Sequence, residues 1–171
     1  AEDAGNANFT LNRTGDNNVV SSVDYVITAG TATDGSDIVV ASGTASFGAG
    51  DTSAIIQVRV YEDMVDELDE TFTVAISNPT NATLGTTVSA MGTITDNDDA
   101  PVINIGNAAV SEDTGTIDFV VSLTTASTGT VSVDYSAAGG TATAGTDFVA
   151  SSGTVTFAPG ETSKTISLTV V

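Results

Sequence analysis

The chain of 171 residues contains no cysteine, no histidine and no tryptophan. Without cysteine and histidine it can form neither a Cys/His zinc site nor a thiol, histidine-base or Ser-His-Asp catalytic centre. No disulfide is possible, so the cysteine content does not identify a redox compartment. No apolar run approaches the roughly 18 residues of a membrane-spanning helix, which predicts no direct membrane insertion in this segment.

Basic residues are almost absent. Arg13, Arg59 and Lys164 stand against 22 acidic residues, which gives a formal net charge of −19. Binding to nucleic acid is therefore excluded, because that binding requires clustered Lys and Arg to displace counterions. Hydrophobic residues still make up 40% of the chain, so it is not a disordered acidic tail. The natural small partner of such a chain is a cation.

An internal repeat organises the sequence. VDYVITAGTATDGSD at 23–37 returns as VDYSAAGGTATAGTD at 133–147, and SGTASFGAGDTS at 42–53 returns as SGTVTFAPGETS at 152–163. Both pairs are offset by 110 residues, and about 25 of the first 60 residue pairs at this offset are identical. A repeat of this length indicates two homologous domains rather than the turns of a solenoid.

The repeat predicts domains at 1–99 and 100–171. The second copy stops at Val171, the counterpart of Tyr61, so it lacks everything that follows Tyr61 in the first copy. The first copy begins after the position of an opening strand, whose counterpart in the second copy is 101–111. We expect the chain to be either a fragment of a longer array or a subunit whose gaps another chain fills.

The local pattern predicts β-structure throughout. Apolar and polar residues alternate with a period of two in several short segments: 9–11, 23–27, 56–60 and 72–76. Gly, Asn, Asp, Ser and Thr fill the stretches between these segments. The pattern predicts an all-β fold of two tandem Ig-like antiparallel β-sandwiches, the first short of its opening strand and the second incomplete at its C-terminus.

Acidic residues concentrate in EDMVDELDETF at 62–72, which holds six carboxylates in eleven positions. A helix is disfavoured because it would bring like charges together at i,i+4. A solvated loop, a catalytic carboxylate pair and a cation site remain possible interpretations. Catalysis is disfavoured because the chain has no tryptophan, few aromatic residues and no long loop to form a cleft, so we do not expect an enzyme.

The ordered set of motifs resembles the Calx-β family, whose sandwich modules occur in sodium–calcium exchangers, in an integrin subunit and in arrays of bacterial surface proteins. The motifs of the first copy are Glu2-Asp3, 23–37, 43–52, Asp63/Glu67/Glu70/Phe72 and Ile94/Asp96/Asp98. The second copy carries only the first three of them: Glu112-Asp113, 133–147 and 153–162.

The resemblance implies a calcium cluster at one pole of the first domain, formed by Glu2, Asp37, Asp63, Glu67, Glu70, Asp96, Asp98 and Asp99. Ca²⁺ takes six to eight oxygen ligands, so eight carboxylates predict two or more ions. Three other acids of the 62–72 stretch fall outside the ligand pattern: Glu62, Asp66 and Asp69. In the second copy only a partial site is expected, from Glu112, Asp113 and Asp147.

The leading interpretation is a calcium-binding structural repeat of a secreted surface adhesin or filament protein, located outside the cell. Residues 96–99 both close the first domain and form the linker, so Ca²⁺ bound there would rigidify the junction. The expected partners are calcium ions and neighbouring repeats or identical subunits. A regulatory calcium sensor and a filament subunit completed by strand exchange between chains are the alternatives.

Overall fold

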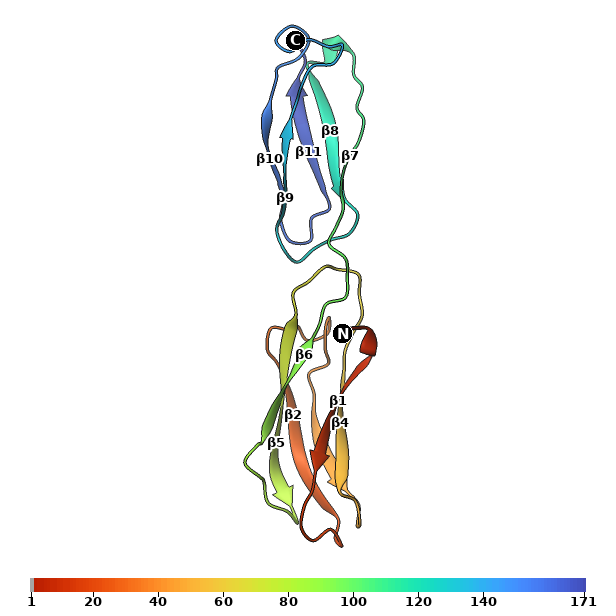
Figure 1. Cartoon of the computed structure of the whole chain (residues 1–171), viewed down its shortest axis with the longest axis vertical. Helices are drawn as coiled ribbons and strands as arrows, with labels where there is room; N and C mark the ends of the chain where they lie inside the picture. Colours follow the sequence, from red (N-terminus) through yellow and green to blue (C-terminus); the bar gives the residue numbers. More distant parts are fainter. Residues whose placement is uncertain (1) are drawn as a thin grey trace. The chain divides into compact units, whose positions relative to one another are not determined.

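The computed structural model describes residues 2–171, which contain eleven β-strands and two short 3-10 helices (Figure 1). The first seven elements are η1 (Glu2–Ala4), β1 (Asn6–Asn12), β2 (Ser21–Ala29), β3 (Ser42–Phe47), β4 (Ser53–Arg59), β5 (Glu70–Thr80) and β6 (Ser89–Ile94). The remaining six are β7 (Ile103–Ile105), η2 (Glu112–Thr114), β8 (Thr116–Leu123), β9 (Val131–Ser136), β10 (Ser152–Phe157) and β11 (Ser163–Thr169). Within the described part of the chain, no helix has the length and apolar character needed to cross a membrane.

The chain divides into two compact units. The first unit comprises Ala1–Asp63 and Leu68–Asn97, and the second comprises Met64–Glu67 and Asp98–Val171. The domain limits drawn from the sequence, 1–99 and 100–171, stay a prediction.

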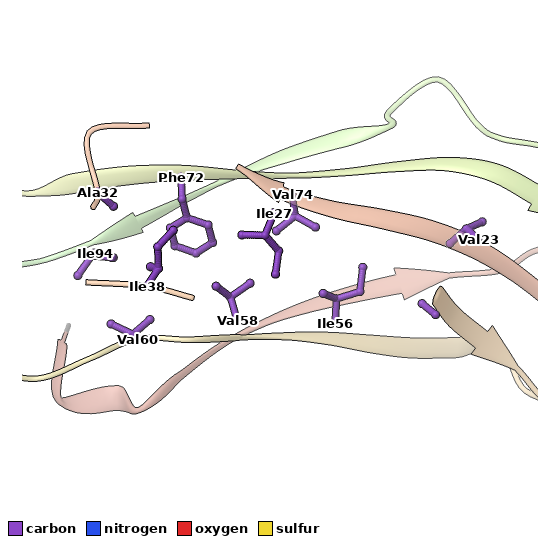
Figure 2. Packing of buried hydrophobic residues seen from close by; sticks show 11 residues of the cluster. Val23, Ile27, Ala32, Ile38, Ile56, Val58, Val60, Phe72, Val74 and Ile94 are labelled. Carbon is purple, nitrogen blue, oxygen red and sulfur yellow. The ribbon is translucent and has the colours of Figure 1, made fainter. Parts of the chain in front are cut away.

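Two antiparallel sheets form the first unit. One sheet pairs β1 with β4, and the other has the strand order β3-β2-β5-β6. The predicted alternation is visible in β5, where Phe72 and Val74 are buried while Thr71 and Thr73 on the other face are half-buried. The buried side chains of both sheets meet in one core cluster (Figure 2).

Phe72 is the largest of these core side chains and is 1% exposed. Its ring meets the ring of Phe9 edge to face, with 5.6 Å between the centroids. Phe9 lies on β1 and Phe72 on β5, so this contact joins the two sheets. Gly92 lies opposite Phe72 on β6, where a Cβ atom would collide with the ring.

Arg13 follows β1 and lies at the far end of this strand from Glu2. Its guanidinium donates hydrogen bonds to the Ser21 hydroxyl and to four backbone carbonyls, those of Asn17, Val19, Gly48 and Asp51, over distances of 2.6–3.1 Å. The same group lies 5.3 Å from the centroid of the Phe47 ring. A single cation therefore holds together the 13–20 loop, the 48–52 loop and the start of β2 at this end of the first unit.

The second unit repeats the sandwich with fewer strands. Its sheets have the orders β11-β8-β7 and β10-β9. Strand β7 pairs with β8 and has no counterpart among the described strands of the first unit, whereas counterparts of β5 and β6 are absent from the described part of the second. The predicted all-β class of two tandem antiparallel sandwiches is confirmed, including the different gaps in the two copies.

Candidate metal centre

A tight turn after β2 fixes Asp37, which is 6% exposed. Its Oδ2 accepts a hydrogen bond from the Thr33 N–H at 2.5 Å, and its own N–H donates to the Thr33 carbonyl at 3.0 Å. Gly35 stands between them with φ of 92°, a left-handed conformation that costs glycine little. The Asp37 carbonyl also accepts a bond from the N–H of Tyr61, just after β4. The carboxylate is therefore held in a fixed direction by its own turn.

Two further carboxylates lie beside Asp37. Glu70 is the first residue of β5 and pairs with Ile94 of β6, while Glu67 belongs to the preceding loop. One oxygen from each of the three carboxylates lies within 4.8 Å of the other two. We call this set the Asp37 group: Asp37, Glu67 and Glu70.

A second set of three forms around Glu2, which lies in η1 and is 5% exposed. Asp96 and Asp98 come from the segment after β6, and each contributes an oxygen within 4.8 Å of the others. The Asp96 N–H donates to Oδ1 of Asp69 at 3.3 Å, which positions the start of that segment. We call this set the Glu2 group: Glu2, Asp96 and Asp98.

The structure thus brings six of the eight predicted ligands together, in two groups of three. Asp63 and Asp99 are exposed and belong to neither group. Among the acids left out of the ligand pattern, Asp69 accepts the bond from Asp96, and Oδ2 of Asp66 accepts a bond from the Ser127 hydroxyl at 2.8 Å. Glu62 accepts a long bond of 3.5 Å from the side chain of Asn97. The sequence pattern gave no indication that these three carboxylates accept hydrogen bonds that hold loops in place.

The donor set suits a hard divalent cation. Each group presents three carboxylates, and carboxylate and carbonyl oxygens are the ligands that Ca²⁺ and Mg²⁺ prefer. Ca²⁺ accepts six to eight oxygens in flexible geometry, whereas Mg²⁺ demands a strict octahedron and sheds its water reluctantly, so a set of several carboxylates from separate segments suits Ca²⁺ better. In a chain of net charge −19, a bound cation converts the repulsion within each group into attraction.

The second unit keeps one part of this arrangement. Asp147 occupies the same turn as Asp37, and its Oδ2 accepts a bond from the Thr143 N–H at 2.6 Å. Glu112 and Asp113 of η2 are exposed. No group of three close carboxylates forms in the second copy within residues 2–171, and the partial site expected there stays a prediction.

The Calx-beta domain family model matches residues 1–98 and again residues 96–171. Among curated proteins, sodium/calcium exchanger 1 of Felis catus is 33% identical over 152 residues, covering 77% of this chain and 16% of its own length. Sodium/calcium exchanger Calx of Drosophila melanogaster is 30% identical over 170 residues, covering 98% of this chain and 18% of its own. The chain thus spans only about a sixth of the length of these relatives.

Solved structures give a matching result. The structure described as CBD12 from CALX1.2 aligns with a TM-score of 0.55 at 29% identity, covering 99% of this chain and 70% of its own. The apo form of the Calx CBD1 domain aligns with a TM-score of 0.53 at 33% identity, covering 57% of this chain and 87% of its own. A third, the CBD12 structure from CALX1.1, is described as a calcium-binding domain.

Proposed function

The chain belongs to the Calx-beta domain family, in two consecutive copies, and from this premise we propose that it is a calcium-binding module of a longer protein. The proposed ligands are the carboxylates of the Asp37 group and the Glu2 group, assembled from four separate segments of the chain. The close approach of three carboxylates in each group is the observation that carries the proposal.

Each bound ion would supply positive charge where the chain concentrates negative charge. Asp37 is positioned by its turn before any ion arrives, because its hydrogen bond to Thr33 is internal to that turn. Glu67 lies in an irregular loop, so its placement should depend more on the cation. Ca²⁺ binding is thereby linked to the order of the 62–69 loop and of the segment after β6.

A regulatory calcium sensor is the form of this function that the comparisons favour, because the curated relatives are sodium/calcium exchangers. The interpretation as an extracellular adhesin or filament repeat receives no support from them, and neither does a cell-surface location. No comparison points to an enzyme, and we propose no catalytic role for the carboxylates.

Structural stiffening is a second candidate, favoured by one observation. Asp96 and Asp98 lie in the segment that joins β6 to β7, so an ion held by them would restrict the backbone of that segment. The affinity separates the two roles, because sensor sites bind Ca²⁺ with a Kd of about 10⁻⁷–10⁻⁵ M and extracellular modules with about 10⁻⁴–10⁻³ M.

Isothermal titration of the 171-residue chain with CaCl₂, after exhaustive chelation, tests the proposal. We expect saturable binding with a Kd in the sensor range, and a titration with MgCl₂ that is at least about tenfold weaker. A Kd near millimolar would favour the stiffening role. Absence of saturable binding at millimolar Ca²⁺ would overturn the proposed function in both forms.

A further inference from the structure

A set of hydrogen bonds joins the turn after β2 to the start of β5. The Thr71 carbonyl accepts bonds from the N–H groups of Gly30 at 3.0 Å and of Ala32 at 3.1 Å. The Thr71 N–H donates to the hydroxyl oxygen of Thr31 at 2.8 Å. The hydroxyl oxygen of Thr71 lies 3.3 Å from that of Thr31 and accepts a longer bond of 3.5 Å from the Thr31 N–H. Both polar groups of the Thr71 backbone are therefore held by residues 30–32, and we call this set of bonds the Thr31–Thr71 clamp.

The clamp begins where the pairing of β2 with β5 ends. The register of these two strands stops at the pair Ala29↔Phe72, and the clamp starts at the next residue of each strand. Gly30 permits the close approach, because a Cβ atom at this position would lie 2.6 Å from the Thr71 carbonyl oxygen. The Thr31 hydroxyl thus replaces a backbone carbonyl as the acceptor for the Thr71 N–H at the point where the chain leaves β2.

Core packing anchors the clamp on both sides. Ala32 follows Thr31 and is 3% exposed, and Phe72 follows Thr71 and is also buried. Both side chains lie in the core cluster of the first unit (Figure 2). The two threonines are themselves more exposed, so their hydroxyls lie at the surface on a backbone that the core holds in place.

Each half of the clamp leads to a ligand of the Asp37 group. Glu70 immediately precedes Thr71, so the bonds to the Thr71 backbone also fix the start of β5. On the other side, Asp37 closes the turn that begins at Thr33, two residues after Thr31, and that turn is held by its own hydrogen bonds. The clamp therefore connects two ordered pieces of backbone, one of which carries Asp37 and the other Glu70.

We propose that Thr31 is a positioning residue for the Asp37 group, and that its hydroxyl sets the separation of the Asp37 and Glu70 carboxylates before a cation arrives. The inference rests on the proposed calcium function and extends it to a residue that is not a ligand. Oxygens of the two carboxylates lie within 4.8 Å, so without a cation their charges repel and tend to move the two segments apart. The clamp opposes this movement. A pair of ligands held in place loses less conformational freedom when Ca²⁺ binds, which raises the affinity.

The Thr31→Val variant tests this role. Valine keeps the β-branched shape but removes the oxygen that accepts the Thr71 N–H. In isothermal titration of the 171-residue chain with CaCl₂ after chelation, we expect the Kd to rise by about three- to tenfold. Thr31→Ser retains the hydroxyl and should bind within about twofold of the parent chain. Thr141→Val is the matched control, since Thr141 is the counterpart of Thr31 at the offset of 110 residues and should leave the Kd within about twofold of the parent.

A double-mutant comparison separates positioning from a general loss of stability. In the Asp37→Asn background, the added Thr31→Val change should alter the remaining Ca²⁺ affinity by less than about twofold, because one ligand of the positioned pair is already lost. A further loss of about threefold or more in that background would overturn the positioning role. So would a parent-like Kd for Thr31→Val alone, or equally weak binding by Thr31→Ser and Thr31→Val. In each of these cases the parent chain still binds Ca²⁺ and the proposed function stands, whereas no saturable binding by the parent chain would overturn both.

Discussion

At the residue scale, Asp37 and Asp147 form a matched pair, because the same turn and the same hydrogen bond hold both carboxylates. Only Asp37 has two other carboxylates within 4.8 Å. We predict that Asp37→Asn lowers the Ca²⁺ affinity by about tenfold or more, since it removes a charge while keeping an oxygen that accepts the Thr33 N–H. Isothermal titration of the variant measures the change.

The Asp147→Asn variant is the control for that experiment. It makes the same chemical change in the same type of turn, and the Ca²⁺ affinity should stay within about twofold of the parent. If both substitutions weakened binding to the same extent, the cation would not be held by the Asp37 group.

Arg13 gives a second prediction at this scale. Lysine in its place would keep the charge but could not reach four carbonyls and a hydroxyl at once, since its ammonium is a single donor centre without the planar fork. We expect Arg13→Lys to lower the free energy of unfolding by about 2–3 kcal/mol, measured by urea denaturation. Arg59→Lys is the control, because Arg59 is exposed and only lies over the Tyr61 ring at 4.9 Å. A loss of similar size there would show that any arginine replacement has this effect.

At the element scale, strands β5 and β6 approach closely because Gly92 leaves room for the Phe72 ring. We predict that Gly92→Ala destabilises the first unit by about 1–3 kcal/mol, because the added methyl group would overpack the core. Urea denaturation followed by the tyrosine signal measures the loss. Gly85→Ala should be nearly neutral, since nothing lies within 4 Å of a Cβ at that position. Equal stability of the two variants would contradict the packing described.

The strands could be predicted from the sequence, and much of the site could not. Alternation reports directly which face of a strand is buried, so β1, β2, β4 and β5 were predicted near their observed positions. Loop side chains carry no such signal. Asp63 is exposed and lies outside both groups, so its role as a ligand stays a prediction, whereas Asp69, which the ligand pattern left out, holds the Asp96 backbone.

Arg13 illustrates the same limit more sharply. Most of its acceptors are backbone carbonyls, and every residue type has one. No composition or spacing could have indicated that these particular carbonyls converge, because their convergence depends on how two loops pack after the sheets have formed.

At the scale of the whole molecule, the two units differ in both core size and cation chemistry. The core of the first unit contains eleven buried hydrophobic residues, and that of the second contains six. We predict two transitions in differential scanning calorimetry, the lower one from the second unit, because less apolar surface is buried there. Ca²⁺ at about 100 times its Kd should raise mainly the upper transition, by on the order of 10 °C, because four of the six proposed ligands belong to the first unit.

A different pattern of Ca²⁺-induced shifts would contradict this prediction. If Ca²⁺ raised the lower transition instead, or both by the same amount, the ion would be bound by the second unit or by both. In the same scan, the Asp37→Asn variant is expected to lose most of the shift that Ca²⁺ produces in the upper transition of the parent chain.

The surroundings of Arg13 have a consequence for how the first unit responds to its environment. Oxygen atoms converge at both ends of β1: at one end they surround the Arg13 guanidinium, which is part of the chain, and at the other the proposed cation must come from solution. The positive charge is therefore always present at the Arg13 end, whereas at the Glu2 end it depends on the calcium concentration. A change in calcium concentration should therefore alter the order of the loops at the Glu2 end, while the loops at the Arg13 end keep the same order.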